Sequence, residues 1–221
     1  MVNIARLIDY ALLKAEATNS DIARFCAEAR KFGFWSACVN PSQVRSAAAA
    51  LAGSGIKVCT VVGFPLGASL TEDKVYETRV ALRDGATEID MVLNLGEFKS
   101  GEAGPVLEDI QAVVHACRES SALCKVILET SSLTDTEKAR ACELCVKAGA
   151  DFVKTSTGFG RGGARVEDVT MLSRLVKPHG LGVTAAGGIR TLADVQKMLV
   201  AGATRIGTSH GAKIMREAAR V

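Results

Sequence analysis

The sequence contains no apolar run that approaches the roughly 20 residues needed to cross a membrane. Its first residues, MVNIARLIDYALLK, lack the basic start, long apolar centre and small-residue cleavage site of a signal peptide. Charge of one sign is also scarce, because 27 basic and 24 acidic residues are interspersed and leave a net charge of +3. Without a basic stripe or tail, no nucleic-acid partner is indicated. We therefore expect a cytoplasmic protein that binds neither nucleic acid nor membranes.

The cysteines do not form a disulfide pattern. There are seven, an odd number, and most lie within apolar stretches, which is typical of reduced thiols in a protein interior. Cys142 and Cys145 are spaced as C-x-x-C, but they lie in a stretch of helical period without a second pair to complete a zinc site. Redox or zinc chemistry at this pair is therefore the less favoured interpretation.

Short apolar runs alternate with longer segments of helical period, which is the pattern of βαβ units and a parallel sheet. We predict strands over residues 5–10, 35–39, 57–62, 88–93, 124–128, 151–155, 181–184 and 205–208. We predict helices over residues 20–32, 41–52, 71–84, 104–119, 134–148, 166–177, 191–201 and 210–219. Eight strands close a barrel, whereas an open doubly wound sheet usually has fewer. The sequence thus predicts an α/β protein, a single (β/α)8 TIM barrel that forms one domain over residues 1–221.

Lys154 is the strongest candidate for chemistry. In such barrels the active site lies at the carboxyl ends of the strands, and Lys154 lies near the end of the sixth predicted strand, before a polar turn that ends at Gly158. Burial disfavours an ammonium and lowers its pKa, and the neutral amine can attack a carbonyl to form a Schiff base. A lysine that reaches the rim, or pairs with a carboxylate, is the alternative. Lys57 and Lys125 begin their strands and are weaker candidates.

Other polar residues lie within the predicted strands or in the turns that follow them. Alternation places Glu88 and Asp90 on one face of the fourth strand, where Asp90 is a candidate acid/base or a structural hydrogen-bond acceptor. Glycine-rich turns, 185–191 and 206–211, follow the seventh and eighth strands, where barrels of this fold commonly bind phosphate. The alternative is that these turns need glycine only because they are tight.

The run Phe152-Val153-Lys154-Thr155-Ser156-Thr157-Gly158-Phe159 resembles the Schiff-base lysine motif of the deoxyribose-phosphate aldolases. The similarity extends over essentially the whole chain, through residues 38–41, 60–67, 88–91, 125–130, 187–191 and 205–209. This resemblance implies a class I aldolase that reversibly cleaves 2-deoxy-D-ribose 5-phosphate to acetaldehyde and glyceraldehyde 3-phosphate. It implies an aldehyde or sugar-phosphate partner, and neither a metal nor an organic cofactor.

The resemblance also implies roles for individual residues. Lys154 would be the nucleophile and Asp90 the proton-relay carboxylate. Asp9 and Cys38 would line the substrate pocket, with Thr184 near them. The phosphate would be bound by residues of the glycine-rich turns, namely Gly158, Gly187, Gly188, Arg190, Gly207, Ser209 and His210.

This chain departs from the family pattern around the same pocket. A second lysine, which in the family lowers the pKa of the nucleophile by like-charge repulsion, is replaced by Thr184. The usual Asp-His-Thr reads Asp9-Tyr10-Ala11, and a serine of the last turn is His210. Two alternatives therefore stay open. One is a divergent or engineered Schiff-base aldolase with a non-phosphorylated or otherwise changed carbonyl substrate, and the other is an impaired barrel that only binds a sugar phosphate. A homodimer is compatible with the sequence.

Overall fold

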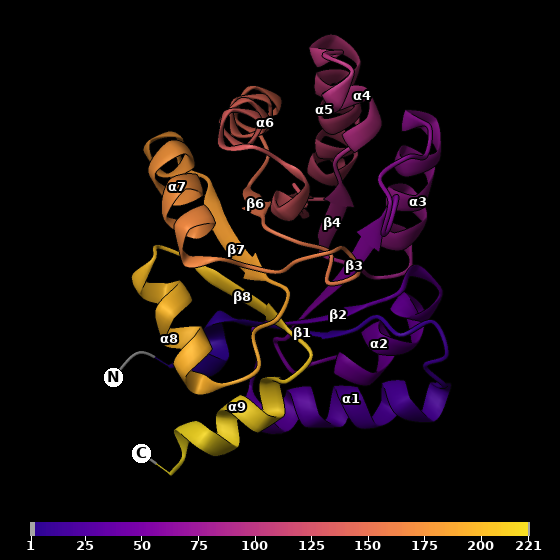
Figure 1. Ribbon diagram of the computed structural model, residues 1–221. Coiled ribbons are helices and arrows are strands. Elements are labelled where there is room, and N and C mark those ends of the chain that lie inside the picture. The colour runs from indigo at the N-terminus through magenta and orange to yellow at the C-terminus, as the bar shows by residue number, and fades with distance from the viewer. Residues whose placement is uncertain (1–2, 221) are drawn as a thin grey trace.

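The computed structural model describes residues 3–220. Its eight strands pair in sequence order, each parallel to the next, and β8 pairs with β1 to close the barrel. The strands are β1 (Ile8–Leu12), β2 (Ser36–Val39), β3 (Lys57–Val62), β4 (Glu88–Val92), β5 (Leu123–Ile127), β6 (Phe152–Lys154), β7 (Gly182–Ala186) and β8 (Arg205–Thr208). The helices lie outside the strands (Figure 1). The predicted (β/α)8 barrel is confirmed.

The α-helices are α1 (Asn19–Phe32), α2 (Val44–Leu51), α3 (Thr71–Arg83), α4 (Leu95–Lys99), α5 (Ala103–Glu119), α6 (Asp135–Ala148), α7 (Val166–Val176), α8 (Leu192–Val200) and α9 (Gly211–Ala218). Short 3-10 helices are η1 (Ile4–Leu7), η2 (Pro41–Gln43), η3 (Thr130–Ser132) and η4 (Lys177–His179). No helix within residues 3–220 is both long and apolar enough to span a membrane.

Two sequence predictions about these elements were wrong. The predicted strand 5–10 begins late, because residues Ile4–Leu7 form η1, in which the Arg6 amide bonds to the Asn3 carbonyl, and β1 starts only at Ile8. The short helix α4 was missed, so residues 3–220 contain nine α-helices rather than eight. The Asn94 side chain caps α4 by accepting a hydrogen bond from the Glu97 amide. Five residues are too few to show a helical period.

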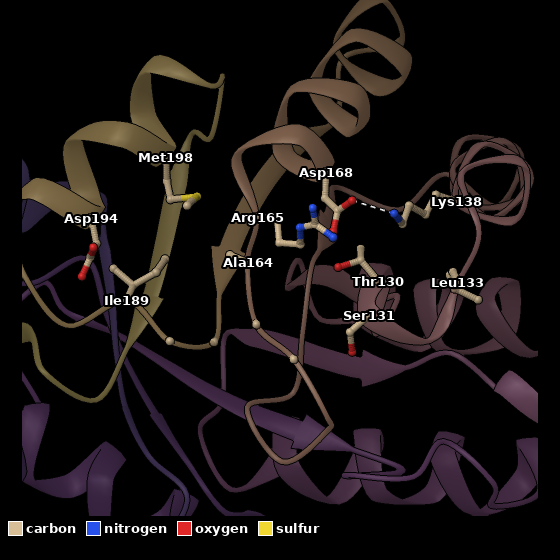
Figure 2. Close-up of a pocket in the computed structure, with 14 residues that line it drawn as sticks. Thr130, Ser131, Leu133, Lys138, Ala164, Arg165, Asp168, Ile189, Asp194 and Met198 are labelled. Atoms are coloured by element: carbon tan, nitrogen blue, oxygen red, sulfur yellow. Dashed lines mark hydrogen bonds and ion pairs between the residues drawn. The ribbon is translucent and has the colours of Figure 1, made fainter.

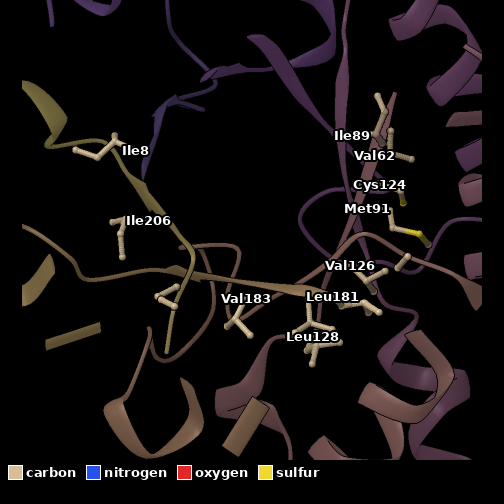
Figure 3. Close-up of a cluster of buried hydrophobic side chains, with 14 of the residues drawn as sticks. Ile8, Val62, Ile89, Met91, Cys124, Val126, Leu128, Leu181, Val183 and Ile206 are labelled. Atoms are coloured by element: carbon tan, nitrogen blue, oxygen red, sulfur yellow. The ribbon is translucent and has the colours of Figure 1, made fainter. Parts of the chain in front are cut away.

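Alternation along the strands separates an apolar outer face from a charged inner face. Ile89 and Met91 on β4 belong to the apolar cluster shown in Figure 3, together with Val126 on β5. The residues that alternate with these along β4 and β5 are Glu88, Asp90 and Lys125, and they are also buried. Barrels of this type usually fill their interior with layers of branched aliphatic side chains. Here the interior holds buried ion pairs beside a small apolar cluster of Cys38, Cys59 and Val61, and the ion pairs form the floor of the candidate site.

Candidate active site

A cavity of about 300 Å³ opens at the carboxyl ends of the barrel strands. Every predicted site residue except Asp90 and Thr184 lines it: Asp9, Cys38, Lys154, Gly158, Gly187, Gly188, Arg190, Gly207, Ser209 and His210. These residues come from β1, β2, β6 and β8, and from the turns that follow β6, β7 and β8. The fold thus brings together side chains that are nearly 200 residues apart in the sequence.

Lys154 and Asp90 form an ion pair at the base of this cavity. The Lys154 side chain is only 6% exposed, and its Nζ lies 2.7 Å from Oδ2 of Asp90. Asp90 lies behind Lys154 and does not line the cavity itself. Its other oxygen, Oδ1, accepts a hydrogen bond from Lys125 Nζ, also at 2.7 Å. Both carboxylate oxygens of Asp90 therefore bind a lysine.

The ion pairs continue across the barrel interior. Lys125 also contacts Glu88 at 2.6 Å, and Arg205 bonds to Glu88 at 2.9 Å and to Asp9. The resulting network contains three carboxylates (Asp9, Glu88 and Asp90) and three cations (Lys125, Lys154 and Arg205), all buried. Formal charge in this network is balanced. From the sequence, Lys125 was a weaker candidate and Arg205 was not singled out. Both residues lie near the starts of their strands, and only the barrel geometry shows that their side chains reach the centre.

The expected lowering of the Lys154 pKa was wrong. Burial does oppose the ammonium, but attraction to Asp90 and the hydrogen bond between them outweigh burial and raise the pKa of Lys154 above its ordinary value. Burial likewise opposes the Asp90 carboxylate, yet Lys125 and Lys154 hold the pKa of Asp90 well below its usual range. Lys154 therefore rests as an ammonium beside a carboxylate, and it must lose a proton before it can attack a carbonyl.

Thr184 lies next to Lys154 on the adjoining strand. The two are register partners in the β6–β7 ladder. The Thr184 hydroxyl is buried and has no hydrogen-bond partner within residues 3–220. A side chain at this position is thus close enough to influence the nucleophile, although threonine has no charge with which to do so.

The departures near the N-terminus fall on two sides of β1. Tyr10 points away from the cavity: its ring stacks on Phe25 at 4.5 Å between centroids, and its hydroxyl donates to Glu28 at 2.6 Å. Ala11, in contrast, lines the cavity. Only the second of these departures therefore changes the surface that a substrate would meet.

The glycine-rich turns surround the cavity mouth. Gly158, Gly187 and Gly188 have φ of +87°, +91° and +79°, a region that favours glycine, so tight turns are part of the reason for these residues. The amides of Arg190 and Thr191, at the start of α8, both donate to Asp194 at 3.0 Å.

The start of α8 is therefore already capped, and the amides that remain for an anion are those of the glycine turns. In the last turn, the hydroxyl of Ser209 lies 3.2 Å from Nδ1 of His210, and both side chains line the cavity.

A second cavity of about 470 Å³ lies behind the turn after β7 (Figure 2). Gly187, Gly188 and Ile189 line both cavities and separate them. Lys138 and Asp168 both line the second cavity, and their side chains form an ion pair at 2.6 Å. Because these buried charges neutralise each other, we interpret them as a link between α6 and α7.

One group of side chains has the composition of a metal site. The sulfur atoms of Cys38 and Cys59 and a carboxylate oxygen of Asp90 lie within 4.8 Å of one another. The same carboxylate already binds the ammonium groups of Lys125 and Lys154. A divalent cation would be placed beside two positive charges, so the geometry fits a charged hydrogen-bond network better than a metal centre.

Comparison with known proteins agrees with this geometry. The profile of the DeoC/LacD family aldolases matches residues 4–218. The deoxyribose-phosphate aldolase of Bacillus cereus (strain AH187) is 54% identical over 214 residues, which cover 97% of this chain and 95% of that protein. The corresponding enzyme of Geobacillus sp. (strain WCH70) is 53% identical over 213 residues, 96% of this chain and 95% of the other.

A solved structure of deoxyribose phosphate aldolase from Aeropyrum pernix, described as tetrameric, superposes with a TM-score of 0.91 at 36% identity. The superposition covers 96% of this chain and 89% of the Aeropyrum pernix chain. Fold, profile match and sequence identity over nearly the full length all agree, and the chain belongs to the DeoC/LacD family of aldolases.

Proposed function

We propose that this protein is a class I aldolase that reversibly cleaves 2-deoxy-D-ribose 5-phosphate to acetaldehyde and glyceraldehyde 3-phosphate. The observation that carries this proposal is the Lys154–Asp90 ion pair at the base of a cavity whose mouth is formed by glycine-rich turns. An amine beside a proton acceptor suits Schiff-base chemistry, and exposed turn amides suit a phosphate. The family relatives named deoxyribose-phosphate aldolase support the same assignment.

In the proposed reaction, Lys154 Nζ gives up a proton and bonds to the aldehyde carbon of the open-chain sugar. The resulting carbinolamine loses its oxygen as water and becomes an iminium ion. The iminium at C1 draws electrons from the bond between C2 and C3, which breaks as the C3 hydroxyl loses its proton. Glyceraldehyde 3-phosphate leaves, and C1 and C2 remain on the lysine as an enamine. Asp90, bonded to Lys154 Nζ at 2.7 Å, is placed to take and return the protons at nitrogen. Hydrolysis of the remaining enamine, after protonation at carbon, releases acetaldehyde and restores the lysine.

The other end of the substrate would lie at the cavity mouth. We assign the phosphate to the turn residues Gly158, Gly187, Gly188, Gly207 and Ser209, with the side chains of Arg190 and His210 as further donors. Asp9 and Cys38 line the cavity between this end and Lys154, where they would contact the sugar. Thr184 would act only through its closeness to Lys154.

Release of acetaldehyde from 2-deoxyribose 5-phosphate, followed with a coupled alcohol dehydrogenase, tests the proposal directly. The wild-type protein should release acetaldehyde, and Lys154→Arg should not. Arginine keeps a positive charge beside Asp90 but stays protonated and cannot form the Schiff base. Equal release by both proteins would refute the assignment of Lys154 as nucleophile.

A changed substrate without a phosphate is the second candidate function. The capping of α8 by Asp194 favours it, because two amides that could have bound an anion are occupied. The ratio of kcat/KM for 2-deoxyribose 5-phosphate to that for 2-deoxyribose separates the two candidates. A ratio far above one supports the phosphorylated substrate, and a ratio near one supports the alternative.

We further propose that residues 1–221 act as one domain and that the chain forms a homodimer. Three large apolar side chains on the β3–α3 loop and α3, Leu66, Leu70 and Tyr76, are more than two-thirds exposed. Burial between two copies would remove this surface from water. Light scattering after size-exclusion chromatography tests this assignment, which a monomeric mass at micromolar concentration would refute.

A further inference from the structure

Glu129 is a buried carboxylate that has no cationic partner among residues 3–220. It is 5% exposed and lies just after β5. The other buried carboxylates within residues 3–220 each have a lysine or arginine within 4 Å: Asp9, Glu88, Asp90, Asp109 and Asp168. Burying an unpaired charge is unfavourable unless hydrogen bonds compensate for it. The contacts of Glu129 therefore indicate what it does.

Its hydrogen bonds go to a single residue of the loop after β6. Oε2 of Glu129 accepts the hydroxyl of Thr157 at 2.5 Å and the backbone amide of Thr157 at 3.2 Å. Oε1 is buried and has no partner within residues 3–220. The backbone of Glu129 has φ of +52° and ψ of +60°, an uncommon conformation for a residue with a side chain. The local backbone is thus strained in a way that places this carboxylate under the loop.

The loop is also packed tightly against the carboxylate. A Cβ atom added to Gly160 would lie 2.7 Å from both Cδ and Oε1 of Glu129, which is too close for a real contact. The φ of Gly160 is outside the positive region, so a larger residue here would be resisted only by the need to displace the Glu129 carboxylate. Thr157 and Gly160, both in the loop after β6, therefore lie directly against the Glu129 carboxylate.

The residues that Glu129 holds belong to the catalytic cavity. Thr157, Gly158 and Phe159 all line it, and Gly158 is one of the residues assigned to the phosphate. The Thr157 hydroxyl accepts a further hydrogen bond, at 3.0 Å, from the Phe159 amide. Glu129, Thr157 and Phe159 thus form a hydrogen-bonded chain that passes around Gly158. Glu129 itself does not line the cavity.

We propose that Glu129 is a positioning residue for phosphate recognition: it fixes Thr157 and so holds the turn at Gly158 in the form that binds the substrate phosphate. This inference rests on the proposed aldolase function, since it takes the cavity mouth as the phosphate end. A purely structural carboxylate would stabilise the loop without favouring one end of the substrate. The two roles therefore differ in which substrate loses affinity when Glu129 is changed.

The test compares Glu129→Gln with Glu167→Gln, which removes the same charge from an exposed position in the first turn of α7. Steady-state kinetics are measured with 2-deoxyribose 5-phosphate and with 2-deoxyribose. E129Q should raise KM for the phosphorylated substrate by roughly tenfold, because it weakens the charge-assisted bonds to Thr157. KM for 2-deoxyribose should change by less than about twofold, and E167Q should behave like the wild type.

Thr157→Val provides a second route to the same contact. It removes the hydroxyl that donates to Glu129 and should raise the same KM. The double variant E129Q/T157V should be no worse than the more affected single variant, because both disrupt one contact. Equal losses on both substrates, or no change in KM for the phosphorylated one in folded E129Q, would overturn the proposal.

Two further measurements separate this inference from the function on which it rests. Reductive trapping of acetaldehyde at Lys154 should proceed alike in wild type and E129Q; its absence from the wild type would refute the aldolase assignment but not the role of Glu129. Titration calorimetry with inorganic phosphate needs no catalysis. Weaker phosphate binding by E129Q than by E167Q would support the positioning role, and equal binding would refute it.

Discussion

Lys154 and Thr184 are register partners on adjoining strands, and the buried Thr184 hydroxyl has no hydrogen-bond partner within residues 3–220. Nothing at position 184 repels the Lys154 ammonium. The interior network contains three carboxylates and three cations, so each positive charge is compensated. Burial opposes the ammonium, but attraction to Asp90 outweighs burial, and the pKa of Lys154 is therefore raised rather than lowered.

Replacing the threonine with lysine should activate the enzyme at neutral pH. Thr184→Lys adds a fourth cation to three carboxylates, and competition for Asp90 should lower the pKa of Lys154. A fall of two pKa units would raise the fraction of neutral amine, and with it the rate of Schiff-base formation, by roughly 100-fold. The measurement is the rate of adduct formation with acetaldehyde at pH 7.

Thr184→Val is the matched control, because it keeps the shape of threonine and removes only an unpartnered hydroxyl. It should change the rate by less than about threefold. If T184K remains folded by circular dichroism and yet gains nothing over T184V, charge at position 184 does not limit the reaction.

The rate of Schiff-base formation should rise with pH. The pKa of Lys154 lies above its ordinary value, so below that pKa the neutral amine increases about tenfold with each unit of pH. A plot of log rate against pH should have a slope near +1 between about pH 7 and 9. In T184K the same rise should begin and level off at lower pH. A level profile in the wild type across this range would mean that Lys154 is already neutral.

Lys125 should be essential for stability. It is fully buried and contacts both Glu88 and Asp90, so Lys125→Met leaves the three buried carboxylates of the network with only two cations. Removing one partner of a buried ion pair typically costs about 3–5 kcal/mol in the free energy of unfolding. Lys57→Met is the control, since Lys57 is an exposed lysine at the start of β3. Urea unfolding should show a large loss for K125M and a small change for K57M; similar values for the two would contradict the account of the interior.

Replacing Arg190 should raise KM only for a phosphorylated substrate. Its side chain is exposed at the cavity mouth, away from Lys154. Arg190→Ala should raise KM for 2-deoxyribose 5-phosphate by roughly tenfold, as expected for the loss of a charge-assisted hydrogen bond. KM for 2-deoxyribose should stay nearly constant. An equal effect on the two substrates would place the phosphate elsewhere.

Much of the fold was predictable from local patterns. The bounds of β3 and β8 agree residue for residue with the prediction, because apolar runs and flanking turns mark them clearly. Part of the cavity lining also follows from the sequence, since strand ends of a barrel meet on one side, whereas Asp9 and Cys38 were expected there only from the family resemblance. The glycine turns and Lys154 could therefore be assigned to this side of the barrel from the sequence alone.

The electrostatics of the site were not predictable in the same way. Lys125, Glu88 and Arg205 lie at the starts of their strands, and the stagger between neighbouring strands decides which inward side chains meet in the interior. A sequence does not show this stagger. The sign of the Lys154 pKa shift depends on the contact with Asp90, 64 residues away. Similarly, the role of Glu129 depends on a loop 28 residues later in the chain.

The most direct test of the account is to locate the covalent adduct. The protein is incubated with acetaldehyde and sodium borohydride, digested, and analysed by tandem mass spectrometry. Wild type should carry one ethyl group on Lys154, none on Lys125, and none anywhere in Lys154→Arg. An ethyl group on Lys125, or adduct-free protein even at pH 9, would contradict the claim that Lys154 is a Schiff-base nucleophile.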